Sequence, residues 1–84
     1  MREAIEDKLR RALQPVWIEV LDESENHRGH SGWREGGATH FRVRIGAAAF
    51  HGKTRLERHR MVNALLADEL KGGVHALAIE AEPA

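Results

Sequence analysis

With 84 residues, 13 basic and 13 acidic side chains and a formal net charge of zero, the chain is predicted to form a single domain over residues 1–84 with one modest core. It contains no cysteine, which excludes disulfides, thiol nucleophiles and any metal or iron–sulfur site built from its own thiolates alone. No apolar run approaches the roughly 20 residues that cross a bilayer, and the first residues lack the apolar stretch of a signal peptide, so we expect a cytoplasmic protein without membrane contact.

Residues 2–13 are predicted to form the first helix. Apolar side chains recur there at three- or four-residue spacing and fall on one face, namely Ile5, Leu9, Ala12 and Leu13. Pro15 ends this helix. Residues 16–21 then alternate as a strand does. One face of that strand is predicted to carry Val16, Ile18 and Val20.

Residues 22–38 are predicted to form a flexible loop, because the segment is polar, has no periodicity and contains four glycines. It is long for a connection between two strands, and long loops in small domains often carry function. The letters Gly-His-Ser-Gly at residues 29–32 match the GxxG of KH domains. They lie between two predicted strands, however, which is not where a KH domain clamps nucleic acid.

The second strand is predicted over residues 40–45, where polar and apolar side chains alternate strictly. Phe41, Val43 and Ile45 are expected to point inward. The outward positions are expected to hold His40, Arg42 and Arg44.

A second helix is predicted after a Thr54–Glu57 capping box. The neighbouring Gly52-Lys53-Thr54 is therefore interpreted as a turn and cap and not as a phosphate-binding loop. The helix carries an apolar stripe of Met61, Val62, Leu65, Leu66 and Leu70. Gly72 ends it, and residues 74–79 form an apolar third strand before a charged tail. These elements predict an α/β (α+β) fold in which helices cover a three-stranded sheet.

Charge is distributed unevenly along the chain. Residues 28–60 carry eight basic and two acidic side chains, a balance of +6, whereas both flanking segments are acidic. Five arginines are predicted to line one basic surface, namely Arg42, Arg44, Arg55, Arg58 and Arg60. Such a surface binds nucleic-acid phosphates or an acidic protein equally well, and the pattern alone does not separate the two.

Three histidines are candidate metal ligands. His27 and His30 lie in the predicted loop at a spacing that can chelate a metal, although solvated loop histidines show the same spacing. His59 borders the apolar stripe of the second helix, where a structural, hydrogen-bonded role is an equal alternative. No serine–histidine–carboxylate set or carboxylate pair stands out, so we expect a binding module and not an enzyme.

Several segments together resemble the BolA family in their order and spacing. They are residues 20–24 running into His27, residues 39–43, residues 58–62, residues 67–70 and residues 74–79. The resemblance implies a class II KH-like domain with the element order α-β-β-α-β and a three-stranded mixed sheet.

For function, the resemblance implies partnership with a monothiol glutaredoxin whose active site reads Cys-Gly-Phe-Ser, around a shared [2Fe–2S] cluster used in iron–sulfur trafficking or iron sensing. His59 matches the principal ligand of the family and His27 the loop ligand, with His30 as the alternative. The thiolates would come from the glutaredoxin and from glutathione, since this chain has none.

Two alternatives accompany this interpretation. Some BolA proteins are DNA-binding transcriptional regulators of stress and morphology genes, and the basic segment 28–60 is the candidate surface for that role. A protein-interaction adaptor without metal is the other. The sequence leaves open whether the free protein forms a weak homodimer.

Overall fold

The fold comes from a computed structural model that describes residues 1–23, 40–74 and 76–84. Its elements, in chain order, are α1 (Arg2–Leu13), β1 (Trp17–Asp22), β2 (His40–Ala47), a short 3₁₀ helix η2 (Ala48–Phe50), α2 (Arg55–Leu65), α3 (Ala67–Lys71) and β3 (Ala76–Pro83). The predicted order α-β-β-α-β is confirmed, with η2 as an addition and the second helix divided into α2 and α3. The predicted loop lies outside the described residues except for its first two positions.

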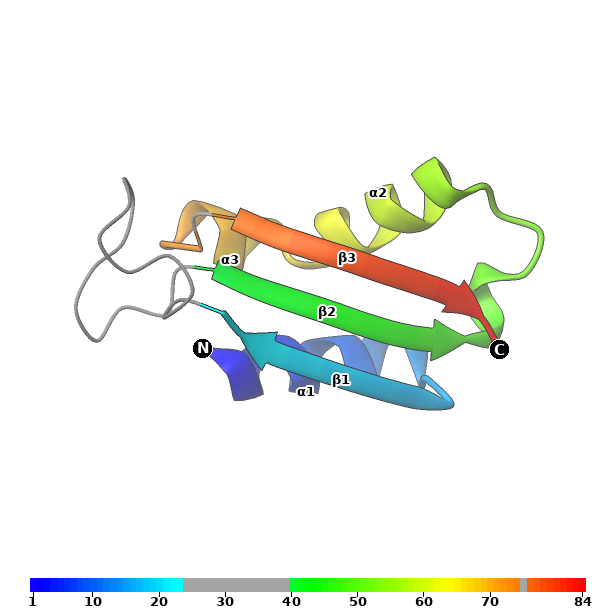
Figure 1. The fold of residues 1–84 in the computed structure, drawn as a ribbon, viewed down its shortest axis with the longest axis horizontal. Coiled ribbons are helices and arrows are strands. Elements are labelled where there is room, and N and C mark those ends of the chain that lie inside the picture. Colours follow the sequence, from blue (N-terminus) through cyan, green and yellow to red (C-terminus); the bar gives the residue numbers. More distant parts are fainter. Residues whose placement is uncertain (24–39, 75) are drawn as a thin grey trace.

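The three strands form one mixed sheet in the order β1-β2-β3. β1 pairs antiparallel with β2, and β3 pairs parallel with β2 (Figure 1). The end of β1 and the beginnings of β2 and β3 therefore lie at the same end of the sheet. This confirms the predicted mixed sheet.

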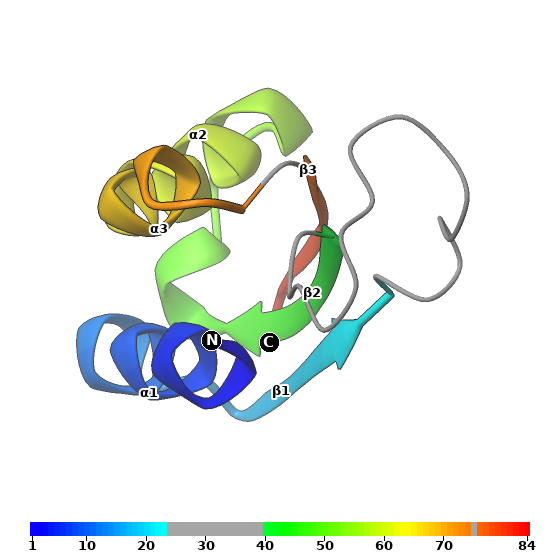
Figure 2. The same ribbon diagram turned by 90° about the vertical axis from the view of Figure 1, so that its left-hand side faces the viewer.

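The helices all lie on one face of the sheet, as Figure 2 shows. That face carries the inward side chains of β2, namely Phe41, Val43 and Ile45, each at most 2% exposed. Ile5 and Leu9 of α1 complete the core from one side, and Val62 and Leu66 complete it from the other. No described helix covers the opposite face of the sheet, which carries the outward side chains of the strands.

The predicted second helix is divided in two. Leu66 leaves helical geometry with φ −102° and ψ 18°, so α2 ends at Leu65 and α3 follows it. Gly72 ends α3 as predicted, but without the left-handed conformation of a glycine cap, which the next residue, Gly73, adopts with φ 128°.

Four strand predictions need correction. β1 begins at Trp17, and Val16, expected on its inward face, is 72% exposed. β2 continues to Ala47, two residues beyond the predicted end. β3 begins at Ala76 and includes most of the predicted charged tail. His40, expected to point outward, is only 7% exposed. Among the described residues, no helix is long and apolar enough to cross a bilayer.

Candidate functional site

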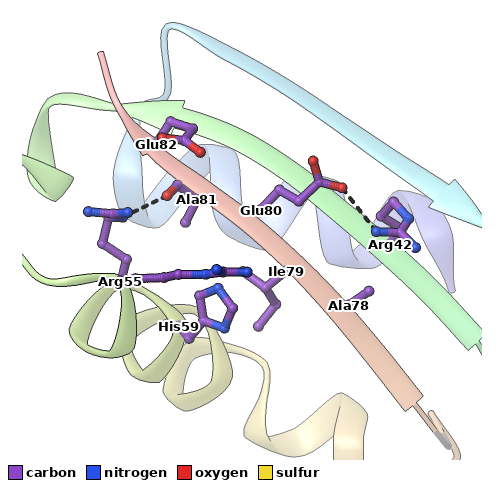
Figure 3. A pocket seen from close by; sticks show the side chains of 9 residues that line it. Arg42, Arg55, His59, Ala78, Ile79, Glu80, Ala81 and Glu82 are labelled. Atoms are coloured by element: carbon purple, nitrogen blue, oxygen red, sulfur yellow. Dashed lines mark hydrogen bonds and ion pairs between the residues drawn. The ribbon is translucent and has the colours of Figure 1, made fainter.

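A groove of about 560 Å³ runs between the first half of α2 and the edge strand β3 (Figure 3). Its helix wall consists of Arg55, Arg58 and His59. Residues 78–82 of β3 form the other wall, with Arg42 reaching in from β2. The groove therefore joins three elements that lie far apart in the sequence.

The capping box fixes where α2 begins and hence which way His59 points. The backbone N–H of Thr54 donates to Glu57 Oε1 at 2.7 Å, and the backbone N–H of Glu57 donates to Thr54 Oγ1 at 3.1 Å. The hydrogen bond from the Thr54 backbone, followed by the interaction with the Thr54 side chain, lowers the pKa of the Glu57 carboxyl below its ordinary value. Arg55 and His59 are four residues apart on this helix and so share one face, which is the face toward the groove.

Arg58 fastens α2 to β3. Its Nε donates to the carbonyl oxygen of Ala81 at 2.7 Å, and its Nη1 donates to the carbonyl oxygen of Lys53 at 2.8 Å. One guanidinium thus connects the start of the helix to the free edge of the sheet. Arg58 was predicted as part of a binding surface, and in the structure it also holds His59 opposite residues 78–82.

Arg42 and Arg44 lie on the uncovered face of the sheet among carboxylates. Arg42 Nε donates to Glu23 at 3.1 Å, and its Nη1 donates to Glu80 at 3.0 Å. Arg44 Nη1 donates to Glu19 at 3.2 Å, and its Nε lies 3.5 Å from Glu80. The carboxylates of Glu23 and Glu80 raise the pKa of Arg42, Glu23 contributing most. Strand pairing therefore places carboxylates beside the two arginines of β2 and offsets their positive charge.

Arg55 and Arg60 are exposed on α2 and make no ion pair with any described residue. Only Arg55 lines the groove. The five arginines predicted to share a surface thus divide into two that are paired on the sheet, one bonded to carbonyl groups and two unpaired on the helix.

The connection to the predicted loop begins beside this groove. The backbone N–H of Glu23 donates to the carbonyl oxygen of His40 at 2.8 Å, and the Glu23 carboxylate holds Arg42, which lines the groove. His27 and His30 lie four and seven residues further along the chain and outside the described residues. Their assignment as ligands stays a prediction.

Within the described part of the chain, no three histidine, cysteine or carboxylate side chains gather as a metal site. Among the described histidines, His59, a half-buried imidazole, is the one that lines the groove. Sequence reasoning missed Glu80 and Glu82 in the other wall, which it had assigned to a tail. Their two-residue spacing is the pattern that could have placed both on one face of a strand.

Comparison with known proteins shows clear relatives. The family model for BolA-like protein matches residues 9–84. The DNA-binding transcriptional regulator BolA of Escherichia coli K12 is 47% identical over 79 residues, which cover 94% of this chain and 71% of that protein. The human BolA-like protein 1 is 47% identical over 78 residues, 93% of this chain and 54% of that protein.

Solved structures agree with these matches. The BolA domain of SufE1 from Arabidopsis thaliana superposes with a TM-score of 0.88 at 46% identity and covers 98% of this chain and 90% of that one. The solution structure of mouse BolA1 gives a TM-score of 0.79 at 40% identity, covering 98% of this chain and 63% of that one. The chain spans about half the length of the human relative.

Proposed function

The chain belongs to the BolA-like protein family, and from this premise we propose that it is a non-enzymatic partner of a monothiol glutaredoxin. The two proteins share a [2Fe–2S] cluster, for iron–sulfur trafficking or iron sensing. This chain contributes histidine ligands, and the glutaredoxin cysteine and glutathione contribute the thiolates. The resemblance to the family carries the choice of partner.

The observation that carries the proposal is the position of His59. Its imidazole is half-buried in a groove, on a helix that is fixed at its start by a capping box and tied to β3 by Arg58. An imidazole can replace a thiolate on one iron of a [2Fe–2S] cluster. A chain without cysteine suits a cluster that a partner protein presents, because it then has to supply only histidine ligands. Bound there, the cluster supplies the iron–sulfur centre that the pair transfers or senses.

His27 is the proposed second ligand, and His30 is the alternative. Glu23 is tied to Arg42 in the groove wall. Four residues of chain span at most roughly 14 Å and seven roughly 25 Å, so both histidines stay within that reach of Glu23. The shorter connection favours His27.

The proposal is tested by anaerobic reconstitution with a monothiol glutaredoxin, iron, sulfide and glutathione. Visible absorption and circular dichroism should give a heterocomplex spectrum that differs from that of the glutaredoxin's own cluster. Substituting His27→Ala and His30→Ala separately then identifies the loop ligand by which of the two changes the spectrum. If the glutaredoxin binds this chain equally well without iron and sulfide, the adaptor without metal is the better account.

DNA binding is the second candidate function, because the E. coli relative is named a DNA-binding transcriptional regulator. The unpaired, exposed Arg55 and Arg60 are the cations on α2 that suit phosphate contacts. A role of this kind would give an affinity that falls steeply with salt. His59→Ala would leave that affinity unchanged, which separates DNA binding from cluster binding.

A further inference from the structure

Trp17, Gly46 and Glu82 form one row across the face of the sheet that no described helix covers. The strand registers pair Gly46 with Trp17 of β1 on one side and with Glu82 of β3 on the other. Residues paired in this way across a sheet point to the same face. This face lies on the other side of the sheet from the helices (Figure 2), so the side chains of the row point away from α2.

The indole of Trp17 lies directly over Gly46. A Cβ atom at position 46 would collide with Nε1, Cε2 and Cζ2 of that ring, so only glycine leaves room for the indole at this point of the sheet. An aromatic ring placed over a strand glycine in this way shields the backbone. Trp17 nevertheless remains 42% exposed. The ring is therefore held in place by the sheet and still offers a surface to solvent.

The next row along the strands shows how this face holds a guanidinium. Arg44 stands at its centre, 3.2 Å from Glu19 of β1 and 3.5 Å from Glu80 of β3. In the row of Trp17 the central position has no side chain, and the carboxylate of Glu82 is exposed. Among the described residues, no cation pairs with that carboxylate or with the ring. This row thus has the carboxylate of such a site, and an aromatic ring, but no arginine.

We propose that the row of Trp17, Gly46 and Glu82 is a docking point for an arginine side chain from a basic segment of a partner protein. A guanidinium within about 6 Å of the centre of an indole is attracted by the ring. Its planar fork can donate to a carboxylate at the same time. Adjacent strands lie about 4.8 Å apart, so a guanidinium stacked on the indole over Gly46 is within reach of Glu82.

The charge of this face favours a basic protein segment over a nucleic acid. Bases also stack on indoles, but a phosphate backbone would meet the carboxylates beside the ring. The described charged residues of this face are four carboxylates and two arginines, a balance of −2, namely Glu19, Glu23, Glu80, Glu82, Arg42 and Arg44. The inference does not depend on the shared cluster, because no histidine takes part in it.

The test is an NMR titration of the ¹⁵N-labelled full chain carrying Trp33→Phe, which leaves Trp17 as the only source of an indole N–H signal. The probe is a blocked Gly-Arg-Gly tripeptide. The control peptide replaces its arginine with citrulline, which has nearly the same shape but no charge. We expect the arginine peptide to give saturable, millimolar shifts in the Trp17 indole N–H and in the amides of residues 46 and 82. The citrulline peptide should bind at least about fivefold more weakly.

Two variants then test the two parts of the site. Glu82→Gln should weaken binding of the arginine peptide about threefold, the value of an exposed ion pair. Trp17→Leu keeps an apolar side chain over Gly46 but has no ring, and should weaken binding by a similar factor, followed through the amides of residues 46 and 82. The matched control Asp68→Asn removes an exposed carboxylate from α3, outside this face. It should leave the affinity unchanged.

Absence of saturable shifts, or equal binding of the arginine and citrulline peptides, would overturn the inference. An equal effect of Glu82→Gln and Asp68→Asn would do the same, because it would show only a response to net charge. Shifts of the same signals on dilution of the chain without peptide would overturn it in favour of a second copy of this chain. Several of its own arginines are exposed, Arg55 and Arg60 among them.

Discussion

Arg58 was expected only to contribute charge to a binding surface, but it also holds α2 in place beside β3. It donates to Ala81 and Lys53 carbonyl oxygens, and those bonds span the gap between α2 and β3. His59, the next residue, depends on that attachment for its place opposite the strand. A sequence pattern can mark Arg58 as basic, but its hydrogen-bond partner lies 23 residues away and follows only from the fold.

Arg58→Ala should therefore lower the free energy of unfolding by about 1–3 kcal/mol, since hydrogen bonds from a charged group are lost and two carbonyls lose their donor. Arg60→Ala removes the same charge from an exposed position of the same helix and should cost at most about 0.5 kcal/mol. Urea denaturation followed by far-UV circular dichroism measures both. Equal losses in the two variants would contradict the anchoring role.

At the scale of elements, the start of α2 was predictable because its chemistry is local. The capping box of Thr54 and Glu57 lies within four residues, and the structure forms both of its hydrogen bonds. The break at Leu66 was not predictable from apolar spacing. The backbone bonds from Leu66 to Val62 and from Leu70 to Leu66 keep four-residue spacing through the break, so the stripe continues across it.

The capping box makes the stability of the fold depend on pH. The folded-state pKa of Glu57 is lowered, so its contribution is present above its unfolded pKa and is lost as pH falls through the lower folded pKa. Glu57→Gln keeps an acceptor for the Thr54 N–H but does not titrate there. Its urea midpoint should fall less than that of the wild type between about pH 5 and pH 2.5. If the urea midpoints of the wild type and of Glu57→Gln fell equally with pH, Glu57 would not be the source of this pH dependence.

Glu69 makes a similar contribution between helices. Its carboxylate accepts a hydrogen bond from Lys8 Nζ at 2.9 Å, which joins α3 to α1 and lowers the pKa of Glu69. Its stabilisation also disappears as pH falls through that lowered pKa. Acid therefore weakens two of the contacts that hold the helices in place.

At the scale of the whole molecule, the sheet offsets part of the charge asymmetry of the sequence. The basic middle segment forms the central strand, and the acidic segments before and after it form its two neighbours. Glu19 and Glu80 therefore flank Arg44 across the sheet. The sequence contained the charges and the alternation, but the strand order that offsets them depends on packing among distant segments.

The candidate site likewise contains residues that the sequence predicts and residues that only the fold brings together. His59 and Arg55 were predictable because both follow from one helix, whereas the meeting of Arg42 with them required the sheet. Glu82 was missed because a charged segment at the end of the chain resembles a tail, and only the pairing with a neighbouring strand identifies it as part of β3. Its place along the edge of the groove depends on the parallel pairing of β3 with β2.

The offset charges lead to a prediction for the DNA-binding alternative. If the chain binds DNA, Arg60→Ala should reduce the slope of log affinity against log salt by about 1, as one lost phosphate contact does. Arg42→Ala should leave the slope nearly unchanged, because Glu23 and Glu80 already pair with that guanidinium. Fluorescence anisotropy at several salt concentrations measures both slopes. A reduction of the slope by Arg42→Ala that equals or exceeds that of Arg60→Ala would contradict the claim that Glu23 and Glu80 offset the charge of Arg42.

The most direct test of the account is the visible circular dichroism of the heterocomplex reconstituted with His59→Ala. His51→Ala is the matched control, since His51 is an exposed imidazole that does not line the groove. We expect His59→Ala to lose or shift the bands of the shared cluster and His51→Ala to keep them. Bands of unchanged position and intensity in His59→Ala would contradict the claim that His59 is a cluster ligand.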